Sequence, residues 1–150
     1  MNQEKSHFGK VTTKDKILVE PVLLKKGTTK IALYGIGSQK DERLHFMMEK
    51  GCVNFKVPED DDYFNILILH QNRVPRSNKY DCFPEKFIPN FIDLVFWGHE
   101  HDDRFGPEYS PYSDCWISQP GSTVATRYVK VRNSANLDNK VHIKSVGRDS

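Results

Sequence analysis

Two histidines one residue apart, in the segment Gly98-His99-Glu100-His101, are the side chains of this chain best placed for chemistry. They follow an apolar run, residues 91–97, that is typical of a buried strand, and Gly98 permits a sharp turn where that strand ends. Because side chains two apart in an extended chain project from the same side, both imidazoles can converge at one spot. Open α/β sheets bind ligands at the carboxyl ends of their strands, and imidazole binds first-row divalent metals. The spacing therefore predicts a metal site.

A second apolar run ends in the same way. Residues 64–69 predict another strand, and His70 follows it directly. A third apolar segment, residues 115–118, runs into a loop of small and polar residues that begins at Gln119. Histidines at the ends of neighbouring strands would make half of a metal centre, so we expect His70 to join the pair.

Each histidine also has a structural interpretation. A lone histidine after a strand can be a surface residue with an ordinary hydrogen bond, and a spaced pair can sit on a loop and bind nothing. The other three histidines, His7, His45 and His142, have no comparable context. His45 falls in a helical pattern and His142 in a short alternating segment, so we interpret all three as structural or solvated.

The composition fits one modest soluble domain. The chain has 150 residues, of which 37% are hydrophobic and 28% charged, and no apolar run approaches the length needed to span a bilayer. Its amino terminus lacks a secretion signal pattern. A formal charge of +2 is too small to indicate a polyanion partner. The scattered Cys52, Cys82 and Cys115 predict neither a disulfide framework nor a zinc ribbon.

The expected elements are mostly strands. A helix is predicted over residues 41–50, opened by acidic residues and followed by Gly51, and a shorter one over residues 84–91. Strands are expected at residues 17–24, 30–34, 64–69, 91–97, 115–118, 126–131 and 141–143. Apolar strands imply a sheet covered on both faces, yet few helices are available to cover it. Either a second sheet packs here or part of the fold is missing.

Several blocks together resemble one known family. They are Lys30 to Gly37, Asp41 to Leu44, Leu69-His70-Gln71-Asn72-Arg73, Phe91 to His101 with its Trp-Gly-His-Glu-His motif, and Gln119 to Thr126. This order is similar to the double-strand-break repair nucleases of the meiotic-recombination-eleven family, which are calcineurin-like metallophosphoesterases. Gly-His-x-His alone would indicate only that superfamily. The resemblance covers roughly residues 7 to 129.

The resemblance implies a two-metal phosphodiesterase, usually with manganese, that acts on DNA as an endonuclease and a 3′–5′ exonuclease. In the family pattern, His70 and His99 hold one metal and His101 holds the other, while Asn72, Arg73, Gly98 and Ser122 support the site. It also implies nuclear localisation, a role in meiosis, homodimers, and two protein partners besides DNA, a coiled-coil ABC-type repair ATPase and a nibrin-like subunit. No membrane association is expected.

The sequence departs from this family upstream of His70. It contains no Asp-x-His, Gly-Asp or Gly-Asn-His-Asp block, which in the family supply the bridging carboxylate and the histidine that protonates the leaving oxygen. We therefore expect no catalytic acid in this chain, an incomplete site for the two Mn²⁺ ions, and no capping or ATPase-binding region. The expected fold is α/β: residues 1–150 form a partial metallophosphoesterase β-sandwich flanked by helices, with the first half absent.

Three functions remain open on these residues. The chain is a metal-dependent DNA nuclease or a piece of one, a non-catalytic module that binds DNA or a repair-complex partner, or a phosphoesterase of small substrates. Trp97, the Gln71-Asn72-Arg73 block and the loop from Gln119 favour the repair nuclease over the last. Missing strands would leave the sheet partly uncovered, so we also expect marginal solubility or dependence on a partner.

Overall fold

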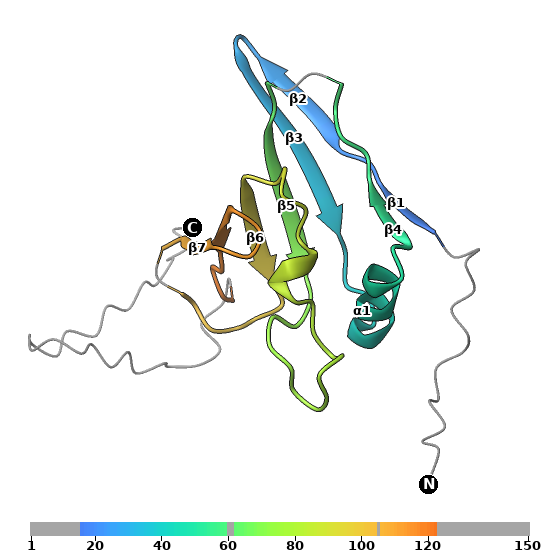
Figure 1. Ribbon diagram of the computed structural model, residues 1–150. Helices are drawn as coiled ribbons and strands as arrows, with labels where there is room; N and C mark the ends of the chain where they lie inside the picture. The colour runs from blue at the N-terminus through green and yellow to red at the C-terminus, as the bar shows by residue number, and fades with distance from the viewer. Residues whose placement is uncertain (1–15, 60–61, 105, 123–150) are drawn as a thin grey trace, which may run out of the picture.

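A six-stranded mixed sheet forms the centre of the protein (Figure 1). The computed structural model describes residues 16–59, 62–104 and 106–122. In spatial order the strands are β2 (Val22–Lys26), β3 (Thr29–Ile36), β5 (Phe64–His70), β6 (Leu94–Gly98), β8 (Cys115–Ser118) and β7 (Glu108–Ser110). The inner strands β3, β5, β6 and β8 pair in parallel, whereas β2 and β7 are antiparallel at the two edges. A mixed sheet with few helices belongs to the α/β class, as the sequence predicts.

The remaining elements are short. Strands β1 (Ile17–Val19) and β4 (Val53–Phe55) form a separate parallel pair, and helix α1 (Asp41–Glu49) lies between β3 and β4 in the chain. The helix predicted over residues 41–50 is thus confirmed, and Gly51 adopts a φ of +63° just beyond its end. No helix in the described part of the chain is long and apolar enough to cross a membrane.

The second predicted helix is wrong in extent. Only a 3₁₀ turn, η1 (Glu85–Phe87), forms within residues 84–91. Pro89 cannot donate a backbone hydrogen bond, and the residue before a proline is disfavoured in helical conformation, so the turn does not continue. The single strand expected at residues 17–24 is wrong: β1 and β2 are separate strands in different sheets, with Pro21 between them, and the strand expected from residue 91 begins only at Leu94. Strands β4 and β7 have no counterpart in the prediction, and the strands expected at residues 126–131 and 141–143 lie outside the described residues.

One face of the central sheet is buried in the core. Its side chains alternate along the strands and include Tyr34, Leu69 and Trp97, each at most 1% exposed. Leu44 of α1, Val19 of β1 and the segment that runs from Phe83 to Ile92 pack against them, so helix, strand pair and loop together cover this face. The three cysteines are also buried with free thiols.

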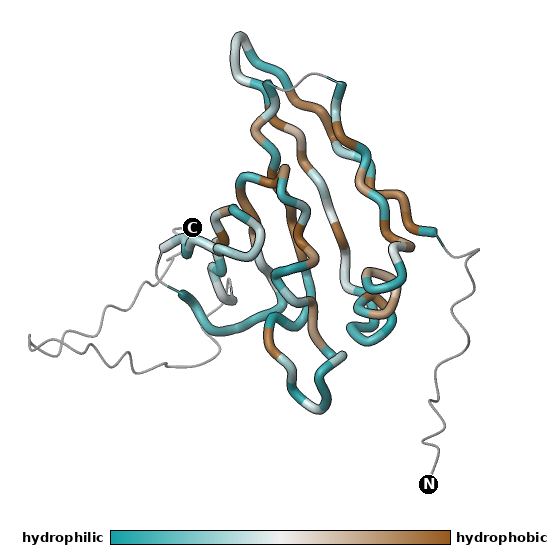
Figure 2. The backbone as a smooth tube through the Cα atoms, in the orientation of Figure 1, coloured by the Kyte–Doolittle hydropathy of each residue, from teal (hydrophilic) through white to brown (hydrophobic). Residues whose placement is uncertain are grey.

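The opposite face of the same sheet is apolar but exposed in the described part of the chain. Cross-strand pairing aligns its side chains in rows, and one row runs Val22, Leu33, Ile66, Leu94, Trp116 and Tyr109. Four members of this "open face" that lie on the inner strands, Phe64, Ile68, Phe96 and Trp116, are 40–52% exposed. Figure 2 shows how the strands carry hydrophobic residues along much of their length.

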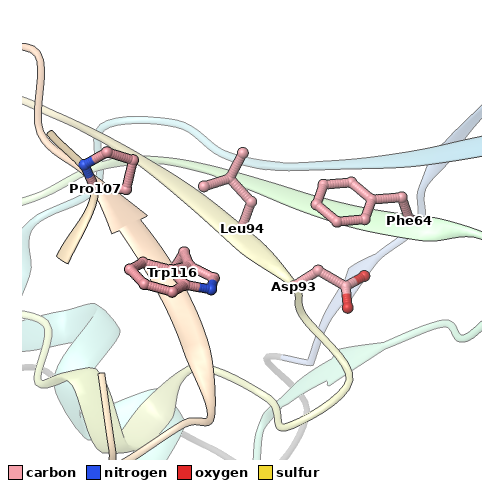
Figure 3. A pocket seen from close by; sticks show the side chains of 5 residues that line it. All are labelled: Phe64, Asp93, Leu94, Pro107 and Trp116. Atoms are coloured by element: carbon pink, nitrogen blue, oxygen red, sulfur yellow. The ribbon is translucent and has the colours of Figure 1, made fainter. Parts of the chain in front are cut away.

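A shallow hollow of about 350 Å³ lies on the open face (Figure 3). Phe64, Leu94 and Trp116 line it, together with Asp93 and Pro107. Contiguous exposed apolar surface on a protein generally marks a contact with another surface. Within the described residues, the apolar sheet is therefore covered by other elements on one face only.

We expect the open face to drive self-association of the chain. Ile68 and Phe96 are directly opposed on β5 and β6, so Ile68→Lys with Phe96→Glu places an opposite-charge pair on this face. The double variant should associate less at every concentration in sedimentation velocity, while its free energy of unfolding changes by less than about 1 kcal/mol.

The matched control is Leu69→Lys, one residue away on the covered face, where the side chain is 1% exposed. A charge buried there should unfold the chain, because its hydration is lost without an ion-pair partner. Unchanged association in the double variant would contradict our interpretation of the open face.

Candidate metal centre at the carboxyl ends of β5 and β6

Two of the three predicted metal ligands lie together. Strands β5 and β6 pair in parallel with His70 opposite Gly98, so His99 follows directly beside the end of β5. The ring centroids of His70 and His99 are 5.1 Å apart, with the ring planes at 76°. Parallel pairing thus brings two imidazoles that are distant in sequence to one edge of the sheet, on an accessible surface.

Gly98 provides the space that the His70 ring occupies. A Cβ atom at this position would lie 3.1 Å from Nδ1 of His70 and 3.2 Å from the backbone oxygen of Leu69. Both distances are shorter than ordinary van der Waals contact, so a Cβ atom here would require the imidazole or the backbone to shift by a few tenths of an ångström. Gly98 therefore leaves room for the His70 ring, whereas its role in supporting a metal site stays a prediction.

The third predicted ligand has a different neighbour. Nδ1 of His101 lies 2.5 Å from the hydroxyl oxygen of Ser122, which pairs the two predicted site residues across the loops that follow β6 and β8. Gly121, with a φ of +70°, lets this approach happen, since a Cβ there would come within 2.9 Å of the backbone oxygen of His101. Among the described residues, no group of three or more His, Cys, Asp or Glu side chains is arranged to hold a metal. The ligand roles of the three histidines therefore stay predictions.

Arg73, whose side chain is largely buried, is the centre of an ion-pair network beside the histidines. Its side chain is 8% exposed, donates hydrogen bonds to Glu85, Glu108 and Gln119 at 2.9–3.2 Å, and stacks 5.5 Å from the ring of Trp97. These partners come from η1, β7 and the loop after β8, so one guanidinium fastens three segments to the end of β5. Charge-assisted bonds of this kind are stronger than neutral ones.

The network extends into the loop that holds His101. The side-chain amide of Gln119 donates to the backbone oxygen of Asp102 at 2.9 Å, and Glu108 also accepts hydrogen bonds from Arg104. Burial alone would raise the pKa of Glu108, but the hydrogen bonds from Arg104 and Arg73 lower it overall. Glu108 is thus held as a carboxylate between two cations.

Asn72 connects the end of β5 to the start of α1. Its Nδ2 donates to Asp41 and to the backbone oxygen of Asp81, and its backbone N–H also donates to Asp41. Gln71, which is buried, donates to the same carboxylate at 2.8 Å. The Oδ1 atom of Asn72 is buried without a hydrogen-bond partner in the described structure. The Gln71-Asn72 pair is therefore anchored by a helix that precedes it by thirty residues.

Five carboxylates that hold the strand ends and loops were missed by sequence reasoning, namely Asp41, Asp81, Glu85, Glu100 and Glu108. The sequence marks Asp41 as a helix-opening residue and as part of a family-resemblance block, and Glu85 as part of a short helix, but gives neither a partner near the histidines. The Oε1 and Oε2 atoms of Glu100 contact the backbone N–H of Arg73 and the guanidinium of Arg76. The adjacency of Glu100 to the histidine pair was the only local signal, because the partners of Asp41, Glu85 and Glu100 lie 12 to 31 residues away.

The loop after Arg73 is organised by Asp81. Its carboxylate accepts hydrogen bonds from the hydroxyl of Ser77 and from the backbone N–H groups of Arg76, Ser77 and Asn78. The Ser77 hydroxyl has the largest effect, and together with the backbone donors it lowers the pKa of Asp81 to about 2, against an ordinary value of 3.8. The loop is therefore stabilised by the ionised carboxylate.

Comparison with known proteins decides the family. Over 123 residues, 81% of its length, the chain is 45% identical to the double-strand break repair protein MRE11 of Mus musculus. It is 48% identical over 111 residues to MRE11 of Coprinopsis cinerea and 43% identical over 129 residues to mre-11 of Caenorhabditis elegans. The chain belongs to the MRE11 family. No family model matches it.

The similarity covers a small part of the relatives. The match to the mouse protein covers 81% of this chain but only 17% of mouse MRE11. The matches to the Coprinopsis and nematode proteins cover 73% and 79% of this chain, but only 15% and 18% of those two relatives. The chain thus spans about a sixth of the length of the curated MRE11 proteins it matches. The resemblance inferred from the His-Gln-Asn-Arg and Trp-Gly-His-Glu-His motifs is confirmed at the level of the family.

Gly98→Ala should separate the two imidazoles. The added methyl group would displace the His70 ring, so the ring proton signals of His70 and His99 should shift in NMR spectra of the histidine-labelled chain. Gly35→Ala on β3 is the matched control, because a Cβ atom there has nothing within 4 Å. Identical histidine signals in both variants would show that Gly98 does not determine the ring contact.

Stability should depend on pH through Asp81. Because its pKa is lowered in the folded chain, the contribution of Asp81 is complete above its ordinary pKa of 3.8 and is lost as the pH falls through about 2. Urea unfolding between pH 2 and 6 should therefore show a smaller pH dependence in Asp81→Asn than in the unsubstituted chain. Parallel pH profiles for the two proteins would contradict the assignment.

Proposed function

We propose that this chain supplies the imidazole ligands of a metal-dependent DNA phosphodiesterase that acts in double-strand break repair. The observation that supports this most directly is the contact between the His70 and His99 rings at the ends of adjacent parallel strands. Membership of the MRE11 family gives the contact its chemical context. In the complete protein the activity would be that of a manganese-dependent endonuclease and 3′–5′ exonuclease, with DNA as substrate.

The donor set fits part of such a centre. Metal–nitrogen bonds to histidine are about 2.1 Å long, so rings as close as those of His70 and His99 can each offer a nitrogen to one cation. His101 would hold a second ion through Nε2, provided that its Nδ1–H donates to Ser122, because this hydrogen bond fixes the tautomer. When bound, two such ions would neutralise the phosphate and activate a water for attack.

The fit is incomplete for two ions. Imidazoles alone offer no negative charge to offset two dications, and Mn²⁺ prefers carboxylate oxygen over nitrogen donors. The family's bridging carboxylate and acid histidine have no counterpart upstream of His70, so a complete centre needs groups from outside these 150 residues. The chain by itself should bind one cation weakly.

The open face suggests how such groups would be supplied. We propose that residues 1–150 are part of a larger nuclease domain and that the remainder of its β-sandwich packs on the open face. His70 follows Phe64, Ile66 and Ile68 at every second position of β5, so its side chain rises from the same face. A second layer there would lie next to the imidazole pair. We assign nuclear localisation and homodimer formation to that larger protein, and we propose that it binds the coiled-coil ATPase and the nibrin-like subunit.

A non-catalytic module is the second candidate. The lack of a three-residue metal group among the described residues favours it, as does a large apolar surface suited to a protein partner. In that case the chain would bind DNA or a repair-complex partner but would not cleave DNA.

Metal binding separates the two candidates. In isothermal titration of the full chain, we expect one Zn²⁺ bound more tightly than Mn²⁺, as the Irving–Williams order requires, and lost in His99→Ala. His142→Ala is the control, since it removes one imidazole from a segment with no site context.

DNA cleavage completes the test. Because its centre is incomplete, the chain alone should cleave DNA very slowly, and manganese-dependent nicking of plasmid DNA that disappears in His99→Ala would support the enzyme directly. DNA binding without cleavage, combined with metal binding that does not depend on His99, would overturn the proposal and favour the module.

A further inference from the structure

Glu100 lies between the two histidines of its motif but its carboxylate is used elsewhere. The side chain is 12% exposed. Its Oε1 accepts the backbone N–H of Arg73 at 2.7 Å, and its Oε2 accepts a hydrogen bond from the guanidinium of Arg76 at 3.0 Å. Both oxygens are therefore committed to the segment that follows β5.

This contact joins the two strand ends that hold the imidazole pair. Arg73 follows His70 by three residues, and Glu100 follows His99 directly. The last paired residues of β5 and β6 are His70 and Gly98, so beyond them no sheet hydrogen bond holds the chain segments together. The carboxylate of Glu100 bridges this gap one step beyond the sheet.

His99 has a backbone conformation that needs such support. Its φ is +77°, in the left-handed region that residues with a side chain rarely adopt. Conformations of this kind persist only where the surroundings fix them. Glu100 is the next residue after His99, so the hydrogen bonds of the Glu100 carboxylate restrain the strained His99 backbone from its carboxyl side.

We propose that Glu100 is a positioning residue that holds the His99 ring against the His70 ring. This inference rests on the proposed function, because the ring pair matters chiefly as a metal-ligand pair. Glu100 itself is not a ligand, since both of its oxygens accept hydrogen bonds from the opposite loop. It acts through the position of the neighbouring imidazole.

The bond to the backbone of Arg73 is the important one. Arg76 is 53% exposed, and an ion pair with an exposed side chain contributes little in water. The Arg73 N–H would instead lose its acceptor if Glu100 were truncated. Glu100→Gln keeps an oxygen for this N–H, whereas Glu100→Ala removes it, so the two variants separate the hydrogen bond from the charge.

The experiment uses the full chain with isotope-labelled histidine, which gives ring signals from only six residues. In the metal-free protein, His70 and His99 should show a ring-to-ring NOE, which Glu100→Ala abolishes and Glu100→Gln retains. Zn²⁺ affinity should fall about tenfold or more in Glu100→Ala, as for other groups that orient metal ligands, and remain near the original value in Glu100→Gln.

Two further variants control for charge and for folding. Asp103→Ala removes an exposed carboxylate from the same loop and should change neither readout. If Glu100→Ala fails to fold, Glu100→Asp keeps the charge but draws the carboxylate back from the Arg73 N–H, and should weaken both the NOE and the affinity.

The outcomes are distinguishable. An NOE and an affinity that survive in Glu100→Ala, or that fall equally in Asp103→Ala, would overturn the positioning role. If the unsubstituted chain binds no Zn²⁺ but its NOE still depends on Glu100, the positioning role stands and the proposed function fails.

Discussion

The parallel pairing of β5 with β6, in the register that sets His70 opposite Gly98, is the constraint on which the site depends. A shift by one residue would turn every side chain of a strand to the other face. The His70 ring would then point into the core and the leucines of β5 outward. In the observed register, a residue without a side chain lies beside His70, and the chain turns at His99 so that the two rings meet.

A polar framework holds the loops that extend from this pairing. The guanidinium of Arg73 is buried against Trp97 and bonded to two carboxylates and one amide, while Asp41 anchors the preceding Gln71-Asn72 pair. A buried charge is tolerated only when it is paired and hydrogen-bonded, so these contacts are mutually dependent. In the described part of the chain, a hydrogen-bonded polar end therefore adjoins a sheet that has one covered and one exposed apolar face.

Much of the fold could be predicted from local sequence, and the site only in part. The apolar runs that end in His70 and in Gly98-His99 correctly predicted the strands β5 and β6 and the polar residues at their ends. The acidic residues at its start and Gly51 after its end predicted α1. The spatial order of the strands could not be inferred, because it depends on crossovers between segments. The roles of Asp41 and Glu100 could not be inferred either, because their hydrogen-bond partners Asn72 and Arg73 lie 31 and 27 residues away in the sequence. Ser122 was expected beside the site from family resemblance, and it lies against His101.

The most direct test of a shared metal position is anomalous diffraction from crystals of the chain soaked with Zn²⁺. We expect a peak between the rings of His70 and His99, within about 2.1 Å of one nitrogen of each. Rings that point apart, or a peak bound to only one of these two histidines, would contradict the shared site.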